Sequence, residues 1–345
     1  MKKVSVIIVN WNGKEILAEC LQSLMSQDYA DLEIWVSDNG SEDGSQTMVR
    51  ELYPSVRLLE NGENLGFGSA VNRVLEKAEG HYFLFLNNDL ELAPDCVVQL
   101  VDLLESDPHI GAAIPKILYH PDKQKPSLNN SAVINSFGVL INYTGIACPN
   151  LVDQQDRDGL TLTETACGGI FMFRREVYEQ VGGFDEDLFL YHEDHDLSWK
   201  IRLGGWKLMV TPKSVCYHHY SFNKGVKKFY RSEKNRLHIL FKNLESKTLL
   251  LIFPALIVVE LAQIVHALVH GWFGLKIKSY IEILGQFPQI ARKRRQIRSF
   301  RKVNDKEISR LYLGTIAVSG MRNPLMDYIL SPLLNFYWKL IRGWV

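Results

Sequence analysis

Residues 4–13 read Val4-Ser5-Val6-Ile7-Ile8-Val9-Asn10-Trp11-Asn12-Gly13, and this stretch decides the fold. Its first six residues are almost all β-branched and apolar, which is typical of a strand buried on both faces. The next four residues form a loop, and an amphipathic pattern then continues to about Met25. The stretch therefore predicts a strand, a loop and a helix, which together are the first unit of an α/β fold.

The same alternation continues over the first 90 residues of the chain. Further strands are predicted at residues 32–37, 56–59 and 81–86, and helices at residues 45–52 and 66–78. Alternating units of this length imply a mostly parallel sheet with helices on both faces.

Polar residues follow three of these strands. The first strand is followed by Asn10 and Asn12, the second by Asp38 and Asn39, and the fourth by Asn87, Asn88 and Asp89. A single Asp or Asn after a strand is ordinarily a turn former. Because parallel strands end at one edge and ligands bind there, three polar ends together predict a ligand site.

A second polar cluster lies at Tyr191-His192-Glu193-Asp194-His195-Asp196-Leu197-Ser198-Trp199, after the glycines of Gly182-Gly183-Phe184-Asp185. The apolar spacing after the cluster predicts a helix, so the carboxylates lie in its first turn. One interpretation is a solvated helix start, which acidic residues favour electrostatically. The other is that the cluster holds a catalytic base.

Between these two regions the periodicity is poor. Residues 119–164 are rich in Asn, Asp, Gly and Pro, and we interpret them as a long excursion with a hairpin around residues 133–141 and a candidate acceptor-binding loop. Residues 166–173 then predict a buried strand, in which Gly168 and Gly169 allow a ligand to approach the backbone.

The net charge of zero is a cancellation. Residues 1–220 carry 17 Lys and Arg against 32 Asp and Glu, and residues 221–345 carry 22 against 7. A basic and apolar second part predicts contact with an anionic membrane surface, whereas the acidic first part argues against nucleic acid. The five cysteines are scattered without metal or disulfide spacing, which favours a reducing compartment.

The basic part contains an apolar stretch at residues 249–269 that is long enough to span a bilayer. Its polar residues Glu260, Gln263, His266 and His270 fall on one third of a helix, followed by a basic run at residues 292–295 and by Arg298, Arg301 and Lys302. Three interpretations remain open: a helix in the membrane plane, a spanning helix, and a helical subdomain packed on the first part or on a second subunit.

Taken together, these motifs resemble the inverting family 2 glycosyltransferases of the GT-A fold, especially the rhamnosyltransferase-like members. The resemblance covers nearly all of residues 4–220. The matching motifs are residues 4–13, 36–41, Asn64-Leu65-Gly66-Phe67-Gly68 with Asn72, Gly182-Gly183-Phe184-Asp185, and Glu193-Asp194 with Asp196. It implies a catalytic GT-A domain at residues 1–220, Rossmann-like in its sheet. The basic and apolar composition of residues 221–345 predicts a helical membrane-associating extension.

The resemblance also implies roles for individual residues. The implied donor-binding residues are Val9, Asn10, Asn12, Asp38, Asn64, Gly66, Asn72, Asn87 and Asn88. The implied acceptor-side residues are Gly168, Gly169, Phe184, Glu193 and Asp196. Asp194 is the implied catalytic base, and Asp89 with His218 the implied ligands of Mn²⁺ or Mg²⁺. Here Asn87 stands where the family's metal motif has its first Asp.

The implied activity is transfer of a sugar from a nucleotide diphosphate donor to a hydroxyl of a glycan, in cell-surface polysaccharide synthesis. The leading donor is dTDP-rhamnose, with UDP-hexoses as alternatives, and the expected acceptor is lipid-linked. We expect peripheral or monotopic attachment to the cytoplasmic face of the cell membrane, with homo-oligomerisation left open. The alternative is a non-catalytic protein of the same fold that binds a sugar nucleotide or a glycan.

Overall fold

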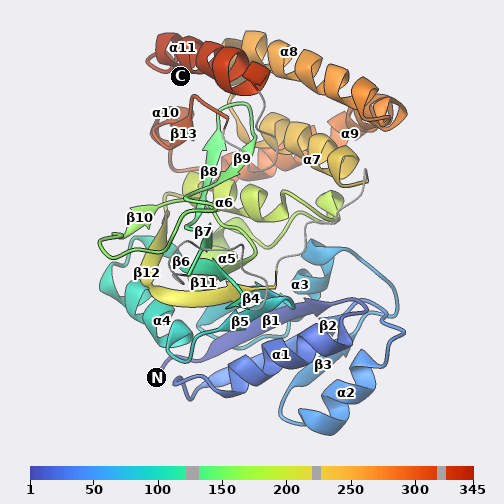
Figure 1. The fold of residues 1–345 in the computed structure, drawn as a ribbon, viewed down its shortest axis with the longest axis vertical. Helices are drawn as coiled ribbons and strands as arrows, with labels where there is room; N and C mark the ends of the chain where they lie inside the picture. The colour runs from blue at the N-terminus through green and yellow to red at the C-terminus, as the bar shows by residue number, and fades with distance from the viewer. Residues whose placement is uncertain (122–131, 220–226, 317–323) are drawn as a thin grey trace.

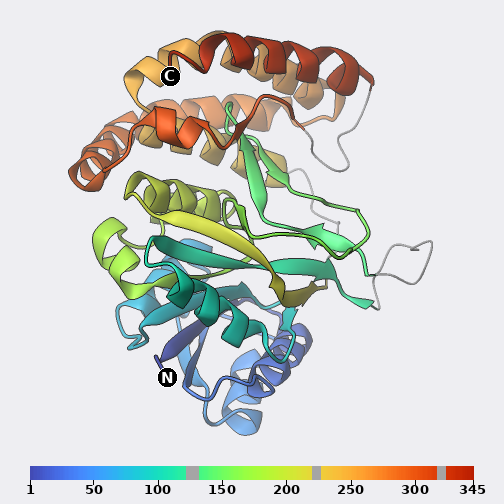
Figure 2. The ribbon, with the colours of Figure 1, turned by 90° about the vertical axis from the view of Figure 1, so that its left-hand side faces the viewer.

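The structure is a computed structural model that describes residues 1–121, 132–219, 227–316 and 324–345. The large sheet and its helices occupy one end of the molecule, and the C-terminal helices form layers at the other end (Figures 1 and 2). The predicted change from one part to the other, between residues 220 and 221, lies outside the described residues.

Four strands form the parallel half of the large sheet. They are β1 (Val4–Asn10), β2 (Leu32–Asp38), β3 (Arg57–Glu60) and β4 (Tyr82–Asn87), in the spatial order β3-β2-β1-β4. The register places Asn10 beside Asp38 and Val9 beside Asn87. The predicted strands are therefore present, and their polar carboxyl ends meet at one edge.

The other half of the sheet is mixed. β11 (Ile170–Arg174) runs antiparallel between β4 and β6 (Ile110–Tyr119), and β12 (Lys207–His218) is parallel to β6. The short strands β5 (Leu90–Leu92) and β10 (Thr163–Glu164) pair with β12. β12 is continuous from Lys207 to His218, with an irregularity between Thr211 and Val215. Tyr220 lies outside the described residues.

Helices cover both faces of this sheet, as predicted. One face packs against α1 (Lys14–Met25), α2 (Ser45–Leu52) and α4 (Cys96–Ser106). The opposite face packs against α3 (Phe67–Leu75), α5 (Arg175–Val181) and α6 (Glu193–Leu203), with the short 3₁₀ helix η2 (Glu186–Leu188) before α6. The architecture is a mostly parallel α/β sheet between two helical layers.

The hairpin expected around residues 133–141 is wrong. β7 (Ile134–Ser136) pairs with β6 of the large sheet, whereas β8 (Val139–Asn142) pairs with β9 (Ala147–Pro149) and with β13 (Tyr312–Leu313) in a second sheet. The chain turns at Gly138, where φ is +72° and an added Cβ would lie 2.1 Å from Thr165 Oγ1. This turn sends the two strands into different sheets. Residues 122–131 of the expected acceptor loop lie outside the described residues.

The C-terminal part is helical, as predicted. Its elements are α7 (Lys227–Asn243), α8 (Ser246–Val269), α9 (Phe273–Phe300), α10 (Asp305–Ser309), the π-helical turn η3 (Met326–Leu330) and α11 (Ser331–Ile341). Helix α6 joins this part to the sheet because it is buried on two sides. Leu197 and Ile201 enter the core under the sheet, whereas Trp199 and Leu203 enter a core shared with α7, α8 and α11.

A buried ion cluster reinforces this junction. Lys242 Nζ on α7 lies 2.6 Å from Asp196 Oδ2 on α6 and also contacts Asp185 Oδ2. Burial alone would lower the pKa of Lys242, but the charges of Asp196 and Asp185 outweigh that effect and raise it. Asn243 Nδ2 donates to the second oxygen of Asp196 at 2.8 Å. The first turn of α6 is thus fixed to α7.

We predict that Lys242→Met destabilises the chain by about 3–5 kcal/mol, because it leaves the buried carboxylate of Asp196 without its ion-pair partner. The measurement is the free energy of unfolding by urea. Lys278→Met is the matched control, since Lys278 pairs with Glu282 at an exposed site, and we expect it to cost less than about 1 kcal/mol. Equal losses in the two variants would contradict the role given to Lys242.

Candidate active site

Asp89 and His218 meet at the polar edge of the sheet. Asp89 follows β4 and His218 ends β12, and the distance from His218 Nε2 to Asp89 Oδ2 is 3.2 Å. His218 Nδ1 lies 3.0 Å from Asn135 Oδ1 of β7, an oxygen that can only accept, so Nδ1 carries the ring proton. The lone pair of Nε2 therefore faces a carboxylate oxygen when the ring is neutral. Such a nitrogen and oxygen pair is a donor set that suits a divalent cation, Mn²⁺ more than Mg²⁺.

A chain of hydrogen bonds continues from this pair along the edge. Asn88 Nδ2 donates to Asn10 Oδ1 at 2.9 Å, and Asn10 Nδ2 donates to Asp38 Oδ2 at 3.0 Å. The structure therefore brings together polar residues from β4, β1 and β2, as their positions after the strands predicted.

Asp38, however, is directed inward. Its carboxylate also accepts bonds from the backbone N and the hydroxyl of Ser41 and from Gln46 Nε2, and its side chain is fully buried. We expected Asp38 to contact the nucleotide, but in this conformation it fixes the loop that follows β2. Asn12, at a φ of +51°, accepts from Glu42 N and so holds the facing loop against it. Beside it Trp11 exposes 57% of its surface.

Three residues expected to bind the donor make internal contacts in the structure. Asn72 accepts from Phe184 N at 2.8 Å and donates to Phe184 O at 3.0 Å, which satisfies its amide. At Gly66, where φ is +83°, an added Cβ would lie 2.3 Å from the carbonyl oxygen of Phe189, and Asn64 Oδ1 accepts from Gly66 N. Together they clamp the start of α3 to the segment before α6.

Phe184 is also a core residue. It is buried and packs edge-on against Phe67 and Phe85, with ring centroids 5.6 and 5.1 Å apart. We expected an acceptor-side position, but the ring fills the space between α3 and the sheet. The sequence pattern could not separate an exposed aromatic of a binding loop from a core aromatic.

The glycines before β11 lie between the two halves of the site. Asn87 N donates to Gly169 O at 3.1 Å, on the side of β4. A Cβ added to the neighbouring Gly168 would lie 3.8 Å from Asp194 Oδ2. The strand end that carries Asn87 and Asp89 is therefore next to the first turn of α6.

The three carboxylates of that turn have different environments. Asp194 is partly exposed, and its Oδ1 accepts from His195 N at 2.8 Å. Glu193 is buried, and among the described residues no group hydrogen-bonds to its Oε2. Burial, and secondarily the charge of Asp194, raises the pKa of Glu193 to about 8. Asp196 is fully buried in the Lys242 cluster and has no surface for an acceptor, so we assign it a structural role.

The mostly parallel sheet between two helical layers is the architecture of the GT-A glycosyltransferases. The chain belongs to glycosyl transferase family 2, whose model matches residues 5–182. A second model, described as the N-terminal domain of galactosyltransferase, matches residues 161–222.

Named relatives agree with this family. The chain is 30% identical over 240 residues to the N-acetylglucosaminyl-diphospho-decaprenol L-rhamnosyltransferase of Mycobacterium tuberculosis, covering 64% of this chain and 77% of that protein. It is 22% identical over 218 residues to the poly-beta-1,6-N-acetyl-D-glucosamine synthase of Staphylococcus epidermidis, covering 62% and 49%.

Two solved structures share the fold. One is GalNAc-T7 with UDP, GalNAc and Mn²⁺, with a TM-score of 0.58 and 19% identity over 74% of this chain and 50% of that chain. The other is the mannosyltransferase PcManGT of Pyrobaculum calidifontis with GDP-Man and Mn²⁺, with a TM-score of 0.52 and 18% identity over 99% and 87%.

The pKa of Glu193 generates a prediction on pH. The folded chain holds the Glu193 proton up to about pH 8, whereas the unfolded carboxyl ionises from about pH 4.3. The contribution of Glu193 to the free energy of unfolding of the wild type is therefore fully present below about pH 4.3, and it is lost as the pH rises to about 8. Relative to the wild type, Glu193→Gln should gain at least about 1 kcal/mol of unfolding free energy between pH 5 and pH 9.

Urea unfolding at pH 5, 7 and 9 measures this difference. Glu51→Gln is the control because Glu51 is exposed on α2, and its difference from the wild type should stay flat. A flat difference for Glu193→Gln as well would show that Glu193 ionises normally in the folded chain.

Proposed function

We propose that the chain is an inverting glycosyltransferase that moves a sugar from a nucleotide diphosphate donor to a hydroxyl of a lipid-linked glycan in cell-surface polysaccharide synthesis. The observation that carries this proposal is that the strand end with Asn87 and the Asp89–His218 pair contacts Gly169, and that Gly168 beside it lies next to the Asp194 carboxylate. The expected roles of Val9, Asn10, Asn87 and Asn88 on the donor side belong to the same proposal.

Asp89 and His218 are the proposed ligands of Mn²⁺ or Mg²⁺. When bound, such an ion neutralises charge on the departing diphosphate. Asn135 fixes the ring proton on His218 Nδ1, which keeps Nε2 directed at Asp89. Asn87 is neutral, so Asp89 provides the carboxylate of this motif.

Asp194 is the proposed base that takes the proton from the acceptor hydroxyl. Its carboxylate is partly exposed and is oriented by His195 N, and a Cβ added to Gly168 would lie 3.8 Å from its Oδ2. Glu193 beside it stays protonated up to about pH 8. A protonated Glu193 cannot take a second proton from an acceptor, so the role of base is assigned to Asp194.

The leading donor is dTDP-rhamnose, with a UDP-hexose as the alternative. The similarity to a protein named as an L-rhamnosyltransferase of a diphospho-decaprenol substrate supports both the rhamnose and the lipid-linked acceptor. A non-catalytic protein that binds a sugar nucleotide or glycan is the alternative function. The neutral Asn87, in place of the first Asp of the family's metal motif, favours that alternative. The Asp89–His218 pair favours the enzyme.

We propose in addition that α8 and α11 attach the protein to the cytoplasmic face of the membrane. Among the described helices, α8 is long and apolar enough to cross a bilayer, with a mean hydropathy of 2.3. Two residues of its polar stripe face the protein, however: Glu260 Oε2 accepts from Lys276 Nζ at 2.8 Å, and Gln263 Nε2 donates to Glu233 Oε1. Intramolecular partners for the stripe support a helix lying in the membrane plane.

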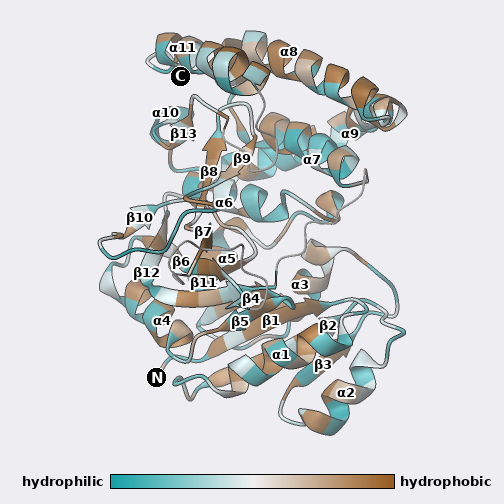
Figure 3. Cartoon of the chain, viewed as in Figure 1, coloured by the Kyte–Doolittle hydropathy of each residue, from teal (hydrophilic) through white to brown (hydrophobic). Residues whose placement is uncertain are grey.

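The opposite side of α8 is an apolar, exposed surface. It consists of Leu250, Phe253, Ile257, Leu261, Val265 and Leu268, and α11 adds Leu333, Phe336 and Leu340. Figures 1 and 3 show α8 and α11 lying along the same end of the molecule, with many hydrophobic residues on both. Apolar side chains over that area favour burial among lipid chains.

Part of the basic run has internal partners. Lys293 pairs with Asp185 and Asp187, Arg294 donates to backbone carbonyls that include Phe241 O, and Arg301 pairs with Asp305. The run was expected to face anionic headgroups as a whole. Its exposed members are Arg292, Arg295, Arg298 and Lys302, and these support the electrostatic part of the proposal.

Asp194→Asn should reduce sugar transfer by roughly 10²–10⁴-fold, because an amide cannot take the acceptor proton. Binding of the donor nucleotide should be retained, since Asp194 belongs to the first turn of α6 and not to the proposed Asp89–His218 cation site. Transfer from radiolabelled donors to extracted lipid-linked glycan measures the rate, and calorimetry measures nucleotide binding. The control is His109→Asn, an exposed site before β6. Full transfer in Asp194→Asn, or no transfer by the wild type with any donor despite nucleotide binding, would contradict the proposal.

Leu261→Glu with Val265→Glu should lower co-sedimentation with vesicles of anionic and neutral lipids by roughly 100-fold, since each apolar side chain contributes about 1.5–3 kcal/mol on burial. Leu52→Glu is the control, because Leu52 is even more exposed than Leu261 and Val265 but lies on α2. Undiminished sedimentation of the double variant would exclude this surface of α8 as the attachment site.

A further inference from the structure

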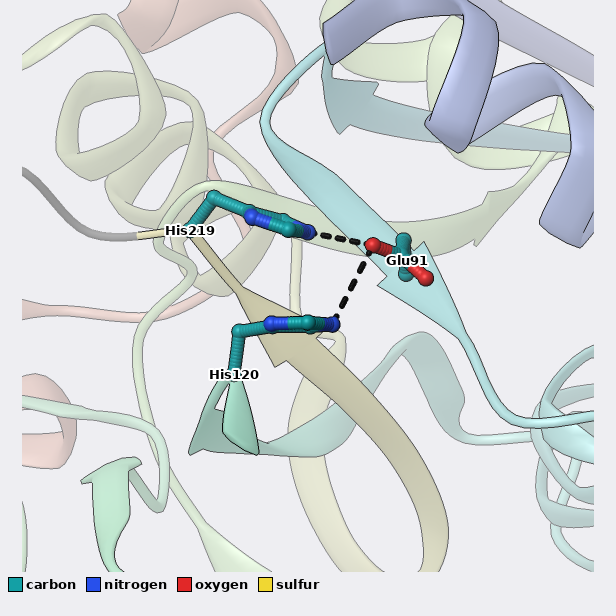
Figure 4. Close-up of side chains that lie close together, drawn as sticks. All are labelled: Glu91, His120 and His219. Atoms are coloured by element: carbon teal, nitrogen blue, oxygen red, sulfur yellow. Dashed lines mark hydrogen bonds and ion pairs between the residues drawn. The ribbon is translucent and has the colours of Figure 1, made fainter. Parts of the chain in front are cut away.

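Three metal-type ligands converge at a position outside the Asp89–His218 pair. They are Glu91 of β5, His120 directly after β6 and His219 directly after β12, and their donor atoms all lie within 4.8 Å of one another. His120 Nε2 is 3.4 Å from Glu91 Oε1, and His219 Nε2 contacts the same oxygen. Figure 4 shows both rings directed edge-on at this carboxylate.

The sheet holds these side chains in place. β5 pairs with β12 so that Glu91 is opposite Tyr217, and β12 pairs with β6 so that His218 is beside Tyr119. The backbone N of His120 donates to His218 O at 3.0 Å. The two imidazoles are stacked with centroids 3.9 Å apart and an angle of 20° between their planes. The convergence therefore comes from paired strand ends rather than from mobile surface side chains.

We propose that Glu91, His120 and His219 form a second divalent-metal site, suited to a transition metal such as Zn²⁺. Two imidazole nitrogens and one carboxylate oxygen are a common ligand set for Zn²⁺. Tetrahedral bonds of about 2.0–2.1 Å place neighbouring ligand atoms about 3.4 Å apart. The distance from His120 Nε2 to Glu91 Oε1 has this value.

The charges around the cluster also favour a divalent cation. Glu19 Oε2 of α1 lies 3.6 Å from His219 Nε2, which adds a second carboxylate. Two stacked imidazolium ions would repel each other at this separation, whereas one metal ion is shared by two neutral rings. The thiol of Cys20 feels the same acidic surroundings: its pKa is raised, mainly by burial and further by the charges of Asp89 and Glu91.

This second site is connected to the proposed donor site through the backbone. His219 N donates to Asp89 O at 3.0 Å, and His120 N donates to the carbonyl of His218. A metal bound by Glu91, His120 and His219 would therefore hold the two chain segments that carry Asp89 and His218. The inference does not depend on the proposed activity, because it concerns metal binding alone.

Zn²⁺ binding to the metal-free full chain, measured by calorimetry and by the Zn²⁺-induced rise in Tm, tests the proposal. We expect this site to bind one equivalent of Zn²⁺, and Asp89→Asn should retain that binding. Glu91→Gln and His120→Asn should each weaken the Zn²⁺ affinity by at least roughly 100-fold. His109→Asn is the matched histidine control and should bind like the wild type. Unfolding without Zn²⁺ checks that each variant is folded, and Co²⁺ absorption should report imidazole ligands in the wild type that are lost in His120→Asn.

Unchanged Zn²⁺ affinity in both Glu91→Gln and His120→Asn would overturn the proposal, as would a wild type that binds no Zn²⁺. Loss of the equivalent in Asp89→Asn with retention in Glu91→Gln would also overturn it, because the ion would then belong to the Asp89–His218 pair. If Glu91→Gln does not fold, His120→Asn decides between these outcomes.

Discussion

Parallel pairing of β1 with β2 and β4 is the constraint on which the rest of the molecule depends. It aligns the ends of three strands, so that the residues after them share one edge without any long-range adjustment. Hydrogen bonds from Asn88 to Asn10 and from Asn10 to Asp38 then cross the edge from strand to strand. The antiparallel strand β11 adds Gly168 and Gly169 to the same place. Pairing of the strand backbones therefore determines where the polar side chains of this edge lie.

Helix α6 connects that edge to the C-terminal helices. Its first turn carries Glu193 and Asp194, and two of its faces are buried, one against the sheet and one against the C-terminal helices. Asp196 lies in the same turn but is held by Lys242. One short helix thus fixes the position of the proposed base and the orientation of the apolar surface of α8 and α11. Attachment to a membrane through that surface would hold the site at a defined height above a lipid-linked acceptor.

Much of this organisation could be predicted from the sequence. The parallel strands follow from β-branched runs such as residues 4–9, and the polar edge follows from the residue type after each strand. The resemblance to family 2 also placed Asp89 and His218 in one site, and they lie 3.2 Å apart. These features depend on local pattern and on strand order, which a single sequence carries directly.

Several expected site residues also make tertiary contacts that no local sequence pattern encodes. Asn72, Gly66 and Phe184 occur in motifs associated with binding, but their groups are used by a contact between α3 and the segment before α6. Asp196 and part of the basic run likewise have partners from distant segments. Asn135, which orients His218, was not singled out because a lone Asn in an irregular segment gives no signal.

The central claim is that Asp89 and His218 hold the cation that binds the diphosphate of the donor. Calorimetric titration of dTDP and UDP, with and without Mn²⁺, tests it most directly in the wild type and in Asp89→Asn. The account predicts that Mn²⁺ tightens binding of the preferred nucleotide to the wild type by at least tenfold, about 1.4 kcal/mol, and leaves the affinity of Asp89→Asn unchanged. Equal tightening in both proteins, or none in the wild type, would contradict it.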